Sequence, residues 1–256
     1  MARDDGVVVT GAGRGIGAAI AQRLAADGAR VVVNDIDAEA ANRVADAIGG
    51  QAVAGDAATA DGVDRLITES RSHLGHIDLY CANAGIAEPG GADASEDAWS
   101  RSWEVNVAAH VRAARVLLPE WLEHGRGHFL ATVSAAGLLT QIGSAPYAVT
   151  KHAALAFAEW LAVTYGDRGI TVQALCPQGV HTDLLDRADE KIRAQLDPTA
   201  MTPAQVADAV ADALDDGPFL ILPHPEVATY YAQRANDPDR WLAGMQRLRA
   251  RLDGNG

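Results

Sequence analysis

The sequence predicts an α/β protein built on one doubly wound parallel sheet of seven strands, with helices on both faces. Short β-branched or apolar runs alternate with longer helical patterns, which implies right-handed crossovers between parallel strands. No proline- or serine-rich linker and no internal repeat divides the 256 residues, so a single domain over residues 1–256 is the simplest interpretation. Apolar residues make up 48% of the chain and aromatic residues 5%, which suits close packing of helices on a sheet.

The expected elements follow one another along the chain. Strands are expected at residues 7–10, 31–34, 52–54, 77–81, 128–133, 170–175 and 219–222. Between them, apolar residues at helical spacing predict helices at residues 16–26, 38–48, 62–74, 99–123, 147–165 and 204–214.

Two further segments are expected around this framework. Residues 183–202 mix apolar residues with many charges, which is typical of a mobile amphipathic lid. A helical extension is expected at about residues 224–256, with helices at 227–235 and 240–252. The last of these carries an apolar stripe that indicates packing on the parent domain or on a sister subunit, formed by Trp241, Leu242, Met245 and Leu248.

The charge and the cysteine content narrow the function classes. A formal net charge of −13 argues against nucleic acid and against anionic membrane surfaces, both of which attract basic patches. The chain has only Cys81 and Cys176, with no C-x-x-C pair or His/Cys cluster, so neither a disulfide framework nor a metal site is expected. The sequence shows no signal peptide and no membrane-spanning run, so a cytoplasmic location is expected.

A glycine-rich turn directly follows the first expected strand. The segment TGAGRGIG runs from Thr10 to Gly17 and opens a helix. Glycines in this place permit a tight turn, close approach of a pyrophosphate and close packing of the helix on the sheet. The context therefore predicts a dinucleotide site rather than an ordinary flexible turn, with contacts from Gly11, Gly13, Arg14, Gly15, Ile16 and Gly17.

Two carboxylates follow the next two strands. Asp35 ends the second strand, where it can accept hydrogen bonds from the adenosine ribose and would repel a 2′-phosphate. This favours NAD as the cofactor and makes NADP the lesser alternative, which a basic Arg14 would support. Asp56 follows the third strand and could meet the adenine edge, or be an ordinary loop carboxylate. After the fourth strand, Asn83, Ala84 and Gly85 stand at the sheet edge where α/β proteins bind ligands.

The segment from Ser134 to Lys151 is where the residues that transfer a proton are expected. Pro146 suits the first turn of a helix and Ser144 a position just before it, so Tyr147 and Lys151 should share one helical face. An ammonium beside a phenol lowers the pKa of the phenol below its usual value of about 10, and the helix N-terminus acts in the same direction. This arrangement predicts a general acid/base, although an amphipathic helix with a half-buried Tyr would show the same spacing.

From about residue 7 to residue 222 the chain resembles the short-chain dehydrogenase/reductase family, which implies a Rossmann-like fold. The matching motifs are the TGAGRGIG turn, the NAG of residues 83–85 and the Tyr147-x-x-x-Lys151 pair. Ser134 stands before Tyr147 at the family's usual separation, and Asn106 takes the place of the family's catalytic asparagine. Each of these motifs alone is modest, but together and in this order they are specific.

The resemblance implies the catalytic roles. Tyr147 would exchange a proton with the substrate oxygen, Lys151 would tune Tyr147 and bind the nicotinamide ribose, and Ser134 would polarise the reacting oxygen. Asn106 would hold a water that relays the proton. After the sixth strand, Pro177, Gly179, Val180 and Thr182 would contact the nicotinamide end of the cofactor, while Gln178 replaces the family's usual glycine.

These features predict an NAD-dependent oxidoreductase that interconverts a secondary alcohol and its ketone by hydride transfer. The alternatives are an NADPH-dependent carbonyl or 3-oxoacyl reductase and, in another class, a non-catalytic NAD-sensing protein. The resemblance also implies a homo-oligomer, a tetramer or a dimer, that uses the helices at 99–123 and 147–165. The substrate is expected to lie against Leu138, Gln141, Ser144, Gln178, Leu184 and Leu185.

Overall fold

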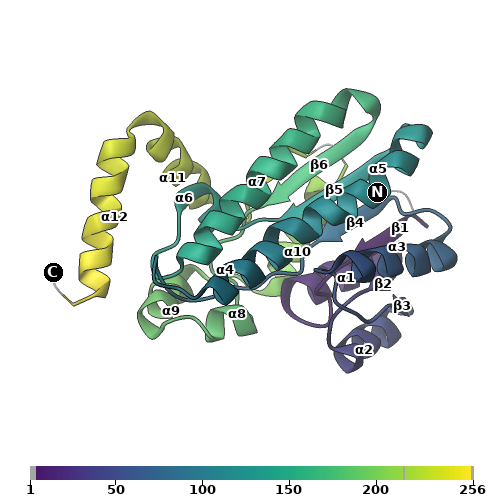
Figure 1. Cartoon of the computed structure of the whole chain (residues 1–256), viewed down its shortest axis with the longest axis horizontal. Coiled ribbons are helices and arrows are strands. Elements are labelled where there is room, and N and C mark those ends of the chain that lie inside the picture. The colour runs from purple at the N-terminus through teal and green to yellow at the C-terminus, as the bar shows by residue number, and fades with distance from the viewer. Residues whose placement is uncertain (1–3, 216, 255–256) are drawn as a thin grey trace.

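The computed structural model describes residues 4–215 and 217–254. Its centre is a seven-stranded sheet in the order β3-β2-β1-β4-β5-β6-β7, with every neighbouring pair parallel, so the predicted fold class is confirmed (Figure 1). The chain enters at β1, winds outward through β2 and β3, and then returns to β4 on the other side of β1. The strands are β1 Gly6–Val9, β2 Arg30–Val33, β3 Gln51–Ala52, β4 Leu79–Ala82, β5 Gly127–Thr132, β6 Ile170–Leu175 and β7 Leu220–Ile221.

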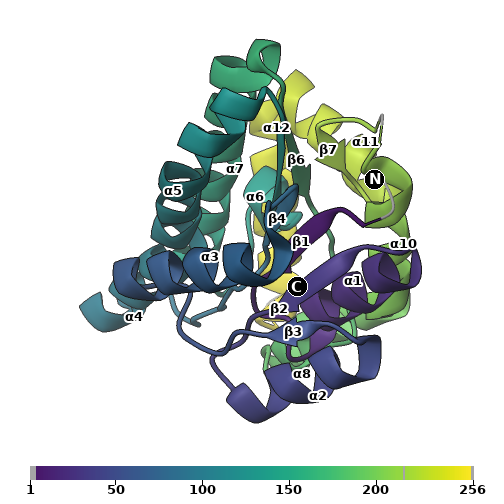
Figure 2. The ribbon, with the colours of Figure 1, turned by 90° about the vertical axis from the view of Figure 1, so that its right-hand side faces the viewer.

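The helices lie in two layers against the sheet (Figure 2). Helices α3, α5 and α7 cover one face, and α1, α2 and α10 cover the other. Shorter helices and the C-terminal pair lie outside these layers. The bounds are α1 Gly15–Ala26, α2 Ala38–Ile48, α3 Ala60–Leu74, α4 Glu96–Trp103, α5 Ala109–His124, α6 Ala136–Leu139, α7 Ala145–Tyr165, α8 Asp183–Asp186, α9 Glu190–Leu196, α10 Pro203–Ala213, α11 Pro225–Asn236 and α12 Pro238–Leu252.

The valine runs of the central strands explain why both faces of the sheet are covered. Along β1, Val8 faces the core beneath α3, α5 and α7, whereas Val7 and Val9 face the core beneath α1 and α10. Successive side chains of a strand point to opposite faces, so an uninterrupted apolar run needs a helix layer on each side. Burial of one such side chain contributes about 1.5–3 kcal/mol.

Polar side chains fix where several helices begin. The carboxylate of Asp37 accepts a hydrogen bond from the Ala40 amide, and the Thr59 hydroxyl accepts one from the Gly62 amide. Ser144 precedes α7 as expected, but its hydroxyl makes no cap and instead donates to the carbonyl of Glu88. Ser144 therefore takes the predicted position just before α7, while its side chain binds the neighbouring loop instead of the helix.

The expected helix at 99–123 differs from the observed one. It begins earlier, as α4, and is interrupted by a π-helical segment at Glu104–Ala108 before it continues as α5. In this segment the amide of Ala109 donates to the carbonyl of Glu104, five residues back. Such wide turns are rare and frequently mark functional sites.

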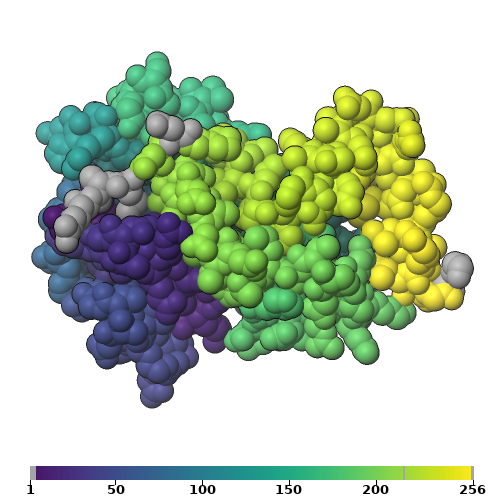
Figure 3. Space-filling model, turned by 180° about the vertical axis from the view of Figure 1, so that it is seen from behind, coloured from purple at the N-terminus to yellow at the C-terminus, as the bar shows by residue number. Residues whose placement is uncertain are grey.

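The C-terminal extension forms a helical pair that protrudes at one end of the molecule (Figure 3). Val227 of α11 is buried in the core, whereas α12 has no fully buried residue. The rings of Tyr230 and Trp241 lie 6.2 Å apart and join the two helices. Across the described residues, no helix has the length and apolar character that a bilayer span requires.

Candidate active site

The candidate site lies at the carboxyl edge of the sheet, where the segments after β1, β2, β4, β5 and β6 meet. In parallel sheets this edge collects loop residues from distant parts of the sequence, and ligands bind where the winding direction reverses. Here the reversal falls between β1 and β4. The predicted cofactor and catalytic residues come directly after these strands.

The glycine turn after β1 has the conformation that its sequence predicts. Gly11 and Gly15 have φ angles of +60° and +57°, which side chains with a Cβ rarely adopt. A Cβ on Gly17 would lie 2.4 Å from the carbonyl oxygen of Gly11, so α1 can approach β1 this closely only with glycine there. The turn leads into the N-terminus of α1, where backbone amides and the helix dipole favour an anion.

Asp35 closes this turn from the end of β2. Its buried carboxylate accepts hydrogen bonds from the amides of Gly13 at 2.9 Å and Asp37 at 3.0 Å. Arg14 points elsewhere, with its Nε 3.5 Å from the carboxylate of Asp183. Asp56 is exposed and accepts from the amide of Ala58, a turn contact at the start of α3.

Asn83 holds the ends of three strands together. Its side-chain amide donates to the carbonyls of Thr10 at 2.9 Å and Gly11 at 3.3 Å, and its oxygen accepts from the hydroxyl of Thr132 at 3.1 Å. The Thr10 hydroxyl in turn accepts from the amides of Asn83 and Ala84. These contacts join the segments that follow β1 and β4 to the end of β5.

Ser134 and Tyr147 are brought together from β5 and α7. Ser134 has a φ of +147°, a strained conformation for a residue with a side chain. Burial raises the pKa of Tyr147, and a hydrogen bond with the Ser134 side chain partly offsets this by lowering it. The expected net lowering of the Tyr147 pKa by Lys151 is therefore not found, because loss of solvent around the phenol has the largest effect.

Lys151 lies one helical turn after Tyr147 and is buried. Its Nζ is 5.7 Å from the centroid of the Tyr147 ring and donates a hydrogen bond to the carbonyl of Thr132 at 2.8 Å. Burial lowers the pKa of Lys151 to about 8. The ammonium is therefore held in a fixed place behind the phenol, and most of it stays protonated at neutral pH.

Asn106 lies in the π-helical segment and is completely buried, so it is no solvent-facing polar residue. Its amide nitrogen donates to the carbonyl of Ile86 at 2.9 Å and to the hydroxyl of Thr150 at 3.0 Å. Its oxygen accepts from the amide of Ile86 at 3.0 Å. The side chain thus joins the loop after Gly85 to α7, one residue from Lys151.

The loop after β6 crosses beside Ser134. The carbonyl of Pro177 accepts from the amide of Ala135 at 2.8 Å, and the hydroxyl of Ser134 lies 3.5 Å from the same carbonyl. Val180 pairs with Met201, and the methyl carbon of Thr182 would lie 3.3 Å from a Cβ on Gly15. The loop therefore spans from Ser134 to the glycine turn.

The predicted substrate-lining residues separate into several environments. Leu138 is fully buried in the core and offers no surface to a ligand, so its assignment is wrong for this conformation. Gln141 and Ser144 border a hollow of about 540 Å³ beside Gly90, and Tyr147 and Ser134 do not line it. Leu184 is exposed, Leu185 is buried and Gln178 is partly buried.

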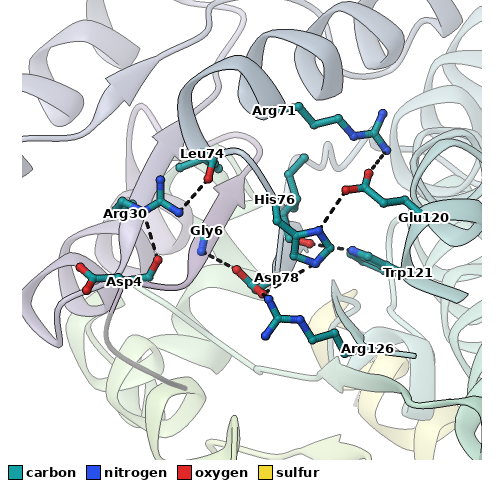
Figure 4. Close-up of polar contacts among 11 residues, drawn as sticks. Asp4, Gly6, Arg30, Arg71, Leu74, His76, Asp78, Glu120, Trp121 and Arg126 are labelled. Carbon is teal, nitrogen blue, oxygen red and sulfur yellow. Dashed lines mark hydrogen bonds and ion pairs between the residues drawn. The ribbon is translucent and has the colours of Figure 1, made fainter. Parts of the chain in front are cut away.

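One further cluster could hold a metal ion, at the opposite edge of the sheet. Figure 4 shows two of its members, His76 and Glu120, with their polar contacts. Ligand atoms of His76, Glu120 and His124 all lie within 4.8 Å of one another. Glu120 is already bound by Arg71 at 2.6 Å and by the Nδ1 of His76 at 3.0 Å. These contacts let the cluster serve as an ion-pair network that joins α3 and α5 to the start of β4.

Sequence reasoning missed His224, which contacts the loop after β6 from the end of β7. In the sequence it stands out only as the centre of a Pro-His-Pro segment. Thr10 and Thr132 were likewise not singled out, although each follows or ends a strand next to Asn83. The sequence did offer a signal for Thr10 and Thr132, namely a hydroxyl at the carboxyl end of a central strand. It offered no such signal for His224, because two flanking prolines do not indicate a contact.

Comparisons with known proteins agree with this geometry. A family model described as short chain dehydrogenase matches residues 5–193. The 1-deoxy-11-beta-hydroxypentalenate dehydrogenase of Streptomyces exfoliatus is 38% identical over 223 residues, covering 84% of this chain and 81% of the relative. The cyclohexanol dehydrogenase of Acinetobacter sp. (strain SE19) is 34% identical and covers 82% of this chain and 87% of the relative. The crystal structure of a short chain dehydrogenase/reductase from Burkholderia phymatum in complex with NAD superimposes with a TM-score of 0.83 at 27% identity, covering 93% of this chain and 96% of that one.

Proposed function

Because this chain belongs to the short-chain dehydrogenase family, we propose that it interconverts a secondary alcohol and its ketone by hydride transfer with a nicotinamide cofactor. The observation that carries this proposal is the meeting of Ser134, Tyr147 and Lys151 beside the glycine turn. A phenol hydrogen-bonded to a serine and backed by a buried ammonium is suited to exchanging a proton with a substrate oxygen.

Each residue has a distinct role in this proposal. The bound nicotinamide would accept or supply the hydride. Tyr147 gives the substrate oxygen a proton in reduction and takes it in oxidation, and the hydroxyl of Ser134 stabilises the charge that develops on that oxygen. Lys151 holds a positive charge near the Tyr147 ring, and Asn106 is proposed to hold the water that relays the proton to solvent. Burial raises the pKa of Tyr147 and so disfavours the phenolate. The positive charge of Lys151 therefore matters most when Tyr147 gives up its proton to a bound substrate.

The residues at the carboxyl edge fit a dinucleotide. The turn from Gly11 to Gly17 leads into the N-terminus of α1, where backbone amides and the helix dipole favour the pyrophosphate. We propose NAD as the preferred cofactor, because the Asp35 carboxylate lies against Gly13 where a 2′-phosphate would meet it. Arg14 supports NADP less well, since it is paired with Asp183. The proposed site is completed by Asp56, Asn83, Ala84, Gly85, Pro177, Gly179, Val180 and Thr182.

The substrate is proposed to be a hydrophobic secondary alcohol, with alicyclic alcohols as the first class to test. The support is the name of the cyclohexanol dehydrogenase relative and the apolar residues of the proposed lid at 183–202. Gln178, Gln141, Ser144, Leu184 and Leu185 are proposed to meet the substrate, some of them after the lid closes.

The chain is further proposed to act as a single domain in a cytoplasmic homo-oligomer. Both described thiols, Cys81 and Cys176, are free and buried, which fits a reducing compartment. Large apolar side chains are exposed along α7, where a sister subunit could pack.

The test is absorbance of reduced cofactor with NAD and NADP in parallel, across aliphatic, alicyclic, aromatic and steroid secondary alcohols. Turnover with NAD is expected, and Tyr147→Phe should lower kcat by at least about a hundredfold while NAD binding is retained. If the protein binds NAD, turns over none of these alcohols, and binds NAD equally well with Tyr147→Phe, it is a sensor, which is the alternative from another class.

Cofactor choice has its own variant. Asp35→Asn keeps an oxygen that can accept from Gly13 but removes the negative charge. We expect the ratio of kcat/KM for NAD over NADP to fall by about tenfold, because the repulsion of a 2′-phosphate is lost. Arg14→Gln serves as the matched change on the other side of the turn. An unchanged ratio in Asp35→Asn would contradict the proposal that Asp35 binds the adenosine ribose.

A further inference from the structure

We propose that His224 is a positioning residue that holds the loop after β6 in the shape that receives the nicotinamide end of the cofactor. This inference rests on the proposed function. His224 is only 2% exposed and lies between β7 and α11. Its Nδ1 is 3.1 Å from the amide nitrogen of Gln178, and its Nε2 is 3.1 Å from the carbonyl oxygen of Gly179.

The two partners fix the protonation of the ring. A backbone amide can only donate, so the Nδ1 of His224 must carry the lone pair, and a carbonyl can only accept, so the Nε2 must carry the hydrogen. One neutral imidazole therefore satisfies two groups in successive residues of the loop. Few other side chains offer an acceptor and a donor at this separation within a rigid ring.

The same loop is connected to the catalytic residues on one side and to the proposed lid on the other. Through Pro177 it accepts a hydrogen bond from the amide of Ala135, next to Ser134. Through Gly179 it accepts a second hydrogen bond from the amide of Met201, at the base of the lid. His224 is thus bonded to the segment that sets the distance between the serine and the lid.

The loop also has unused capacity to bind a ligand. The side-chain oxygen of Gln178 is buried and has no hydrogen-bond partner among the described residues. Leaving such an acceptor unpaired costs free energy, which a donor from a bound ligand would recover. Because His224 holds the backbone amide of Gln178, it also fixes the point from which this side chain extends.

The position of the loop predicts which half of the cofactor depends on His224. Asp35 follows β2, and the loop follows β6, four strands away in the sheet order. With neighbouring strands about 4.8 Å apart, the two lie about 19 Å from each other across the sheet. Disturbing the loop should therefore affect the nicotinamide end and leave the adenosine end unchanged.

The experiment compares binding of NAD with binding of ADP-ribose, which lacks the nicotinamide, by calorimetry. Three variants separate the effects of the two hydrogen bonds. His224→Asn can keep the acceptor for the Gln178 amide, His224→Gln can keep the donor to the Gly179 carbonyl, and His224→Phe keeps neither. We expect His224→Phe to weaken NAD binding by about tenfold with ADP-ribose unchanged, and the Asn and Gln variants to lie between it and the wild type.

His128→Phe is the matched control, because His128 is hydrogen-bonded to Gln173 within the sheet and does not contact the loop. It should change NAD and ADP-ribose binding equally or not at all. If His224→Phe does not fold, the Asn and Gln variants decide the question by the same ratio. Equal weakening of both ligands, or unchanged NAD binding, in the His224 variants would overturn the positioning role. Wild-type protein that binds neither ligand would instead contradict the proposed function.

Discussion

Burial of the Lys151 ammonium lowers the stability of the fold, and the proposed catalytic role of Lys151 requires this burial. The ammonium is enclosed and donates a hydrogen bond to the carbonyl of Thr132 at 2.8 Å. Burial lowers the pKa of Lys151 from 10.5 to about 8. The charged form is thus disfavoured in the folded protein relative to the unfolded chain, although the proposed chemistry needs that charge beside Tyr147.

The pH dependence of stability should reveal this cost. Between about pH 8 and pH 10.5 the unfolded chain holds the Lys151 proton more tightly than the folded protein, so the free energy of unfolding rises with pH in this window. Lys151→Met removes the effect. We expect the wild type to gain up to about 3 kcal/mol relative to the variant between pH 7 and pH 10, measured by urea denaturation.

The control is Lys191→Met, because Lys191 is exposed on α9 and is the other lysine of the chain. Its curve should run parallel to that of the wild type. Parallel curves for Lys151→Met as well would mean that the ammonium is not buried in solution. Turnover should be lost in Lys151→Met at every pH, since no charge then supports Tyr147.

At the residue scale, the sequence predicted those groups whose chemistry needs a particular residue type in a particular motif. Asp35, Asn83 and Lys151 have the positions that the motifs predicted, because glycine turns and strand ends constrain the residues next to them. The net pKa direction of Tyr147 was wrong, since it depends on how much solvent surrounds the phenol. His224 was missed because its partners lie 45 and 46 residues away in the sequence.

At the scale of elements, periodicity predicted the long helices well and the irregular turns poorly. Apolar residues at helical spacing placed α1, α2, α3, α7 and α10 to within a few residues. The same pattern ran unbroken through residues 104–108, although the backbone there takes a wider turn. Burying the Asn106 side chain against Ile86 and Thr150 stabilises this turn, and contacts of that kind are not visible in a local pattern.

The short helices of the substrate side show the same limit. Helix α6 begins at Ala136, two residues after Ser134, which has a positive φ just beyond the end of β5. A serine in this conformation is stabilised by tertiary contacts, here with the loop at Pro177, so the sequence favoured no helix there. As a result Leu138 was expected at the substrate and lies in the core.

At the scale of the whole molecule, two exposed apolar surfaces are candidates for the subunit contact of the proposed homo-oligomer. Helix α7 exposes Val149, Trp160 and Val163, which are 50%, 54% and 85% exposed. Their separations of 11 and 3 residues put them on one face of the helix, so they form a continuous apolar stripe. The C-terminal extension offers a second surface on α12, where Leu242 is 56% exposed.

We expect the α7 stripe to be the subunit interface, because it lies on a rigid helix packed against the sheet, whereas α12 contributes no fully buried residue of its own. A charge placed in an apolar interface without a partner costs several kcal/mol. Val163→Glu should therefore lower the molar mass measured by light scattering after size-exclusion chromatography, and Leu242→Glu should leave it unchanged. Both side chains are exposed in the single chain, so neither variant should unfold the subunit, and the thermal unfolding midpoint of the dissociated form checks this. A smaller mass for Leu242→Glu with an unchanged mass for Val163→Glu would place the interface on the extension instead.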